Sequence, residues 1–156
     1  MAEYITKEGM NKLKKRMNEL IIERPSIIKQ VVTAREMGDL SENAEYHAAR
    51  ERQKYLENEF NHLKSRISTL QVIDSTKIPK DAVRFGAYVT IEELPNRQIS
   101  KLRLVGIDEI YQTDDGYERI SIASPIGKAI IGKKINEIFV VKAPVGERTF
   151  KILDIK

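Results

Sequence analysis

Gly38-Asp39-Leu40-Ser41 is a short connection between two long stretches whose apolar residues recur at intervals of three and four. That alternation is typical of a coiled-coil seam, and two long helices joined by so short a link must run antiparallel. The first seam consists of Met10, Leu13, Met17, Leu20, Ile27, Val31 and Ala34. The second consists of Tyr46, Ala49, Gln53, Leu56, Phe60, Leu63, Ile67 and Leu70.

The first helix has a defined start and one internal interruption. Thr6 is the expected N-cap, because its hydroxyl can accept a backbone hydrogen bond from the first turn. Pro25 removes a backbone hydrogen bond inside the helix. We expect a bend there rather than an end, because the apolar seam resumes in register at Ile27.

Residues 76–156 differ from residues 1–75 in their content of glycine and proline. The first part has one proline and two glycines, whereas the second has four prolines and six glycines. Because these residues mark turns, the second part predicts strands and loops. One short helix is expected after Ser124, with Pro125 at its first position and Gly132 past its end. The expected strands are 87–91, 101–105, 119–122, 138–141 and 149–153.

These patterns predict an α+β protein with two domains. Residues 1–75 form an antiparallel coiled-coil hairpin whose tip lies at 38–45. Residues 76–156 form a small globular domain, an antiparallel sheet with one short helix. We expect a monomer, because both seams are used within one chain.

The composition excludes several classes of protein. The net charge is +4, which permits a nucleic-acid partner without requiring one. The absence of cysteine excludes disulfides, thiolate metal sites and a cysteine nucleophile. The apolar runs are far shorter than the roughly 20 residues of a membrane span, and the start lacks the pattern of a secretory signal. We therefore expect a cytoplasmic protein with no membrane partner.

The acidic residues of the tip allow two interpretations. Asp39 and Glu42 have the spacing of a capping box, in which Asp39 is the N-cap of the second helix and Glu42 its third residue. Alternatively, the pair belongs to a metal or acid–base site, with Glu45 one turn further on. Mg²⁺ requires six oxygen ligands, so two carboxylates alone make an incomplete site. Such a pair could instead complete the active site of another protein.

The residues around the tip resemble a known family. The stretch is Arg35-Glu36-Met37-Gly38-Asp39-Leu40-Ser41-Glu42-Asn43-Ala44-Glu45-Tyr46-His47-Ala48-Ala49, and it is similar to the motif of the bacterial Gre transcript-cleavage factors, in particular the GreA type. Further matches are Thr6-x-x-Gly9-x-x-x-Leu13, Arg24-Pro25 and the stretch from Ser124 to Lys133. The resemblance covers essentially the whole chain. Asn136-Glu137 departs from the Gly-Asp of many relatives, but asparagine tolerates a left-handed turn.

The resemblance implies a fold and a function. Gre factors have an N-terminal coiled-coil hairpin and a C-terminal domain similar to FKBP folds. They bind bacterial RNA polymerase, insert the hairpin into its secondary channel and stimulate cleavage of backtracked RNA. Asp39 and Glu42 then correspond to the tip carboxylates that help to hold a catalytic Mg²⁺ shared with the polymerase. The resemblance implies no stand-alone enzyme and no stably bound cofactor.

Three basic residues beyond the tip are candidates for contact with the 3′ end of the nascent RNA: Arg50, Arg52 and Lys54. In this interpretation they resemble the basic patch of Gre hairpins, and their contacts are with phosphate groups. The alternative is a solvated helix surface on which Arg50 pairs with a neighbouring glutamate. The sequence leaves both open.

Two other functions compete with this interpretation. A prolyl isomerase is suggested only by the FKBP-like second half, and the chain lacks the tryptophan that usually forms the floor of such a pocket. A non-catalytic coiled-coil adaptor or chaperone would favour apolar residues at the tip. The acidic tip argues against the adaptor.

Overall fold

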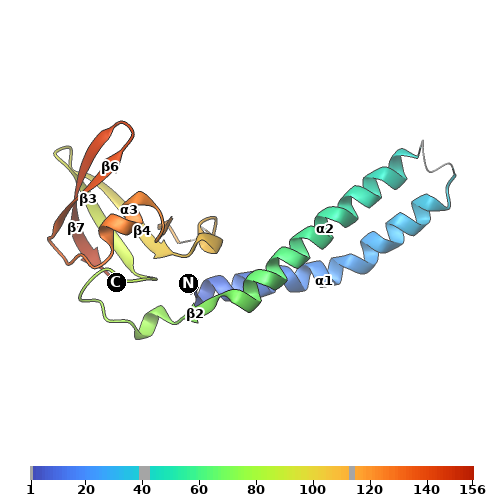
Figure 1. The fold of residues 1–156 in the computed structure, drawn as a ribbon, viewed down its shortest axis with the longest axis horizontal. Helices are drawn as coiled ribbons and strands as arrows, with labels where there is room; N and C mark the ends of the chain where they lie inside the picture. Colours follow the sequence, from blue (N-terminus) through green and yellow to red (C-terminus); the bar gives the residue numbers. More distant parts are fainter. Residues whose placement is uncertain (1, 39–42, 113–114) are drawn as a thin grey trace. The chain divides into compact units, whose positions relative to one another are not determined.

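The computed structural model describes residues 2–38, 43–112 and 115–156 of the chain. They form two compact units, one of residues Met10–Leu70 and one that joins the residues up to Gly9 with Gln71–Lys156 (Figure 1). No helix among the described residues has the length and apolar character needed to cross a membrane. The elements are β1 (Tyr4–Thr6), α1 (Lys7–Arg35), α2 (Ala44–Thr69), β2 (Gln71–Ile73), η1 (Ser75–Lys77), β3 (Tyr88–Leu94), β4 (Gln98–Val105), η2 (Ile107–Glu109), β5 (Glu118–Ser121), α3 (Pro125–Ile130), β6 (Ile138–Ala143) and β7 (Gly146–Ile155).

The first unit is the helical hairpin that the two seams predict. Figure 1 shows α1 and α2 side by side, and α1 continues through Pro25 without ending. An ion pair joins the two helices on their exposed side, where Arg16 Nε lies 2.8 Å from Glu59 Oε2. The core consists of Leu20, Ile27, Leu56 and Leu63, with Leu13, Met17 and Phe60 packed against it. Leu13, Met17, Leu20 and Ile27 belong to the first seam. Leu56, Phe60 and Leu63 belong to the second, so both predicted seams are confirmed.

The second unit contains a five-stranded sheet in the order β5-β4-β3-β7-β6. The pairs β4–β3, β3–β7 and β7–β6 are antiparallel, as expected. The pair β4–β5 is parallel, so the prediction of a wholly antiparallel sheet was wrong at this edge. β5 starts opposite Leu102 of β4, with Leu102 paired to Glu118 and Val105 to Ser121, so the two strands run in the same direction.

The core of this unit lies between the sheet and α3. Ile130 is 1% exposed, while Ile126 and Ala129 pack against the buried residues of the sheet. The hydroxyl of Ser124 accepts a hydrogen bond of 3.1 Å from Gly127 N, which confirms the predicted cap with Pro125 at the first position. Asn136, which stands where many Gre relatives have glycine, has a φ of 70°. This is the left-handed conformation that asparagine tolerates. The globular unit is thus a mostly antiparallel α+β domain.

The strands β1 and β2 were not predicted, and they pair in parallel, with Ile5 opposite Val72. Gln71 N donates a hydrogen bond of 2.9 Å to Glu3 O, and the side chains of Ile5 and Thr6 are completely buried. Residues 2–9 therefore belong to the globular unit, whereas composition alone divided the chain at residue 75.

Candidate functional site

The end of the hairpin lies between Arg35, the last residue of α1, and Ala44, the first residue of α2. The chain leaves α1 through hydrogen bonds from Glu36 N to Val32 O and from Met37 N to Ala34 O, both of 3.2 Å. The predicted site residues Asp39 and Glu42 lie outside the described residues. Their position in the sequence places them between the two helix ends.

Asn43 holds the start of α2. Its Oδ1 atom accepts a hydrogen bond of 3.1 Å from Tyr46 N, and its backbone is extended, with φ −82° and ψ 97°. These are the features of an N-cap. The capping-box interpretation assigned that role to Asp39, so the cap of α2 lies four residues further along the chain. The capping role in α2 therefore needs neither of the two acids.

The same side chain also reaches the first helix. Asn43 Nδ2 donates a hydrogen bond of 2.6 Å to the carbonyl of Ala34, one residue before the end of α1. Next to it, the guanidinium of Arg35 lies 5.8 Å from the centre of the Tyr46 ring, a cation–π contact. Asn43 and Tyr46 thus connect the end of α1 to the start of α2. Sequence reasoning missed the role of Asn43, although an Asn directly before a helical pattern is a recognisable signal.

The three basic candidates do not share one surface. Arg50 and Lys54 line one groove of about 490 Å³ together with His47, Glu51, Gln53 and Glu57. Arg52 lines a different groove, of about 410 Å³, between α1 and α2, where its guanidinium donates a hydrogen bond of 3.0 Å to Gln30 Oε1. The structure therefore brings Arg50 and Lys54 together and separates Arg52 from them.

The described residues contain no group of three histidine, aspartate, glutamate or cysteine side chains that could hold a metal ion. Near the tip, the described part of the chain offers the exposed carboxylate of Glu45, at the second position of α2. Carboxylate oxygens suit Mg²⁺, but two or three of them fall short of its six ligands. A Mg²⁺ ion at the tip would therefore need further oxygen ligands from outside this chain.

The globular unit has a cavity of about 320 Å³ between the sheet and α3. Among the described residues that line it, Phe150 is the single aromatic side chain. Aliphatic, polar and charged side chains form the rest of the lining, including Ile120, Ser100 and Arg148. This surface lacks the aromatic walls of a prolyl isomerase site.

Two buried charged residues of the globular unit were also missed by sequence reasoning. Glu109, 2% exposed, accepts hydrogen bonds from Thr6 N at 3.0 Å, Gly106 N at 3.2 Å and the hydroxyl of Thr6. Arg103 is equally buried and lies 4.4 Å from the centre of the Tyr88 ring. Thr6 also caps α1, as predicted, by accepting a hydrogen bond of 3.0 Å from Gly9 N. These residues attach the N-terminal strand and the first helical turn to the globular unit.

Comparison with protein families matches the chain to two family models. Residues 3–72 match the N-terminal domain of transcription elongation factors, and residues 78–156 match the C-terminal domain of the transcription elongation factors GreA/GreB. The chain is 44% identical over 152 residues to transcription elongation factor GreA of Thermodesulfovibrio yellowstonii, which covers 97% of this chain and 94% of the relative. It is 42% identical over 149 residues to the GreA of Rhodospirillum rubrum, which covers 95% and 93%.

Solved structures also align with the whole chain. GreA factor homolog 1 (Gfh1) of Thermus thermophilus aligns with 100% of this chain and 99% of its own, at 20% sequence identity and a TM-score of 0.46. The elongation factor GreA/GreB of Nitrosomonas europaea aligns with 99% and 98%, at 17% identity and a TM-score of 0.42.

Proposed function

Because the chain belongs to the GreA/GreB family of transcription elongation factors, and to its GreA type, we propose that it rescues backtracked RNA polymerase. The helical hairpin enters the secondary channel of the polymerase. There it stimulates the Mg²⁺-dependent cleavage of the nascent RNA that the polymerase itself performs. Cleavage creates a new 3′ end, from which elongation resumes.

The observation that carries this proposal is the acidic segment between the two helix ends of the hairpin. Asp39 and Glu42 follow the 29-residue helix α1, which is roughly 40 Å long at 1.5 Å per residue. Asn43 joins Ala34 to the start of α2, so the segment that contains the acids is closed at its base by a hydrogen bond. A narrow helical pair of that length is suited to reach a recessed active site.

The two carboxylates act as oxygen ligands and as hydrogen-bond acceptors. In the polymerase complex, Asp39 and Glu42 would hold a Mg²⁺ ion together with ligands of the polymerase, and that ion would lower the pKa of a bound water. A carboxylate that is not bound to the ion would accept a hydrogen bond from the water and orient it. The chain supplies only part of the site, so we assign it no nuclease activity of its own.

The charged surface of α2 would contact the extruded RNA. Arg50 and Lys54 are exposed, share one groove and could each contact a phosphate group. Arg52 is directed to the other groove, where Gln30 holds it, and we assign it a weaker role.

The test uses bacterial RNA polymerase that has been stalled and backtracked on a 5′-labelled transcript in Mg²⁺. The wild-type chain should shorten the transcript rapidly, and Asp39→Ala/Glu42→Ala should lose this effect while binding polymerase as wild type does. The matched control is Glu19→Ala/Glu23→Ala, which removes two exposed carboxylates of α1 away from the tip and outside both grooves and should retain full activity.

Two outcomes would contradict the proposal. If the wild-type chain binds polymerase but leaves the RNA uncut, the chain is a regulator that occupies the channel. If the control pair loses as much activity as the tip pair, the overall charge of the hairpin is responsible and the tip has no special role.

A further inference from the structure

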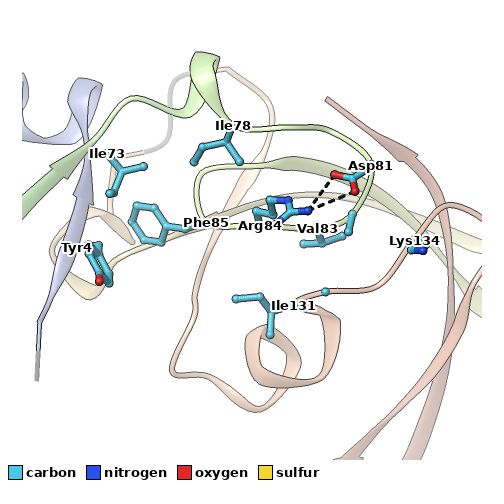
Figure 2. A pocket seen from close by; sticks show the side chains of 11 residues that line it. Tyr4, Ile73, Ile78, Asp81, Val83, Arg84, Phe85, Ile131 and Lys134 are labelled. Carbon is cyan, nitrogen blue, oxygen red and sulfur yellow. Dashed lines mark hydrogen bonds and ion pairs between the residues drawn. The ribbon is translucent and has the colours of Figure 1, made fainter.

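The globular unit has a second and larger pocket, of about 630 Å³, on a surface that the proposed function does not use. Figure 2 shows the side chains that line it. They come from β1, β2, the segment 78–85 and the residues that follow α3. This volume lies within the range of roughly 300–1,000 Å³ that is usual for ligand-binding pockets.

Backbone hydrogen bonds hold the floor of this pocket. Val83 N donates a hydrogen bond of 2.8 Å to Lys133 O, and Gly132 N donates one of 2.7 Å to Val83 O. Val83 is completely buried, and Gly132 has a φ of 82°, which turns the chain directly after α3. The segment 78–85 and the segment after α3 are therefore tied to each other, and the pocket is formed before any ligand binds.

One end of the pocket is apolar. Tyr4 and Phe85 lie with their ring centres 6.1 Å apart, and Figure 2 shows Ile73 and Ile78 beside them. Ile131 forms the opposite wall and is 47% exposed. Aromatic and aliphatic side chains exposed together around a hollow are typical of a site for an apolar anchor of a partner.

The other end of the pocket is charged. Arg84 Nη2 donates hydrogen bonds of 3.0 Å and 3.3 Å to the two carboxylate oxygens of Asp81. Lys134 adds a second positive charge at this end, where Figure 2 shows it on the far side from the aromatic rings. The hydrogen bond from Arg84, together with the nearby charge of Lys134, holds the pKa of Asp81 below its usual value. With two cations and one anion, this end favours an added negative charge.

We propose that this pocket binds an acidic segment of a partner protein, with an aromatic side chain of that segment between Tyr4, Phe85 and Ile131 and an adjacent carboxylate at Arg84 and Lys134. Arg84 uses only Nη2 for its bonds to Asp81, so its other guanidinium N–H groups can donate hydrogen bonds to the ligand's carboxylate. The pocket takes an amphipathic ligand because its apolar and charged ends are separate.

A nucleotide fits this pocket less well than an acidic peptide. Asp81 lies at the charged end and would repel a phosphate, which carries more negative charge than a carboxylate. At the apolar end, the hydroxyl of Tyr4 is the one polar side-chain group among the described lining residues that could contact a base edge. A site that recognises a base needs more such groups.

The test is a titration of the ¹⁵N-labelled full chain, followed by NMR. The probes are three acetylated and amidated peptides, Glu-Phe-Glu, Lys-Phe-Lys and Glu-Ala-Glu, and the nucleotide uridine monophosphate. Glu-Phe-Glu should cause saturable shifts of the amide signals of Val83, Gly132 and their neighbours. Lys-Phe-Lys and Glu-Ala-Glu should bind at least about tenfold more weakly, which corresponds to roughly 1.4 kcal/mol for loss of the charge or of the ring.

Substitutions in the wall of the pocket provide the controls. Ile131→Asp places a negative charge in the wall and should lower the affinity for Glu-Phe-Glu at least about tenfold. Ile99→Asp changes an isoleucine of β4 with nearly the same exposure, 49%, outside the lining, and should leave the affinity unchanged. Shifts of equal size with Lys-Phe-Lys, tighter binding of uridine monophosphate at the same amides, or no saturable shift with Glu-Phe-Glu would each overturn the proposal.

Discussion

The side-chain amide of Asn43 donates a hydrogen bond of 2.6 Å to the backbone carbonyl of Ala34, so the residue that caps the second helix also binds the end of the first. A carbonyl in the last turn of a helix has no partner within the helix. The Ala34 carbonyl already accepts a hydrogen bond of 3.2 Å from Met37 N, so Asn43 gives it a second donor and also satisfies one unpaired N–H group at the start of α2. This contact closes the base of the segment that contains Asp39 and Glu42.

Replacement of Asn43 tests both contacts. Asn43→Ala should lower the free energy of unfolding by about 1–2 kcal/mol, because a lost N-cap alone contributes about 0.5–2 kcal/mol. Asn43→Asp keeps the cap oxygen but loses the donor to Ala34. Its free energy of unfolding should therefore lie between those of Asn43→Ala and wild type. Urea unfolding gives the energies, and amide hydrogen exchange at residues 34–48 shows where stability is lost. An Asn43→Asp variant as stable as wild type would mean that the bond to Ala34 contributes nothing.

Gly9 offers a test in which two effects have opposite signs. Gly9 lies inside α1, where alanine is usually about 1 kcal/mol more favourable than glycine. A Cβ atom at this position would, however, overlap the carboxylate of Glu109. Because Glu109 is buried and held by Thr6 and Gly106, it has little freedom to move. We expect Gly9→Ala to destabilise the protein by about 1–3 kcal/mol, the usual effect of overpacking.

The control for Gly9 is a double-mutant cycle with Glu109→Ala. If the overlap with Glu109 is the cause, Gly9→Ala should be harmless or stabilising in the Glu109→Ala background. Equal destabilisation in both backgrounds, measured by urea unfolding, would refute this explanation.

The helical part of the fold could be predicted in detail because its signals are local. The seam residues Leu20, Ile27, Leu56 and Leu63 form the hairpin core, since helical periodicity alone decides which side chains face inward. The caps at Thr6 and Ser124 were recognised for the same reason. In each case the partner lies within a few residues in the sequence.

Contacts between distant parts of the chain could not be predicted. β1 and β2 have three residues each, too few to show alternation, and they pair across more than 60 residues of hairpin. The parallel edge β4–β5 depends on the path of the chain through η2 rather than on strand composition. Glu109 and Arg103 have the residue types of an exposed surface, and only the fold shows that they are buried.

The tip also shows a limit of motif spacing. Asp39 and Glu42 have the spacing of a capping box, yet Asn43 is the cap of α2. Spacing alone cannot decide between Asp39 and Asn43 as the cap of α2. The choice also depends on the hydrogen bond between the Asn43 side chain and Ala34 at the end of α1. The roles of Asp39 and Glu42 in catalysis, and of Arg50, Arg52 and Lys54 in RNA contact, remain predictions.

The ion pair between Asp115 and Arg119 predicts a dependence of stability on pH. Arg119 Nη1 donates a hydrogen bond of 2.5 Å to Asp115 Oδ1, and this bond holds the pKa of Asp115 below its usual value of 3.8. A carboxylate whose pKa is lower in the folded state stabilises the protein above the unfolded pKa, and the contribution is lost as the pH falls through the folded pKa. Asp115→Asn should therefore be less stable than wild type at pH 7, and the difference should shrink below about pH 4.

Urea unfolding of wild type and Asp115→Asn at pH 7, 5 and 3 measures this difference. Glu147→Gln, a substitution of an exposed carboxylate of β7 in the same unit, controls for the general effect of acid on the protein. A difference between wild type and Asp115→Asn that stays constant down to pH 3 would show that Asp115 does not contribute through its charge.

The separation of the basic residues into two grooves predicts which pair contacts RNA. Arg50→Ala/Lys54→Ala removes two positive charges from one groove, and Lys29→Ala/Arg52→Ala removes two from the other. Each contact with a phosphate of a single strand contributes about 0.7 to the slope of log affinity against log salt. We expect Arg50→Ala/Lys54→Ala to reduce this slope by about 1.4, measured through cleavage stimulation on backtracked complexes. The reason is that both residues are exposed on one groove of α2.

The second pair should have a smaller effect, because Arg52 is held to Gln30 of α1 by a hydrogen bond of 3.0 Å, whereas the bond from Arg50 to Gln53 of its own helix is longer, at 3.3 Å. The concentration of the factor that gives half-maximal cleavage, determined at several salt concentrations with the same transcript, distinguishes the two variants. Equal losses for both pairs would mean that the net charge of the hairpin, and not one groove, attracts the RNA. A larger loss for Lys29→Ala/Arg52→Ala would place the RNA in the groove between α1 and α2.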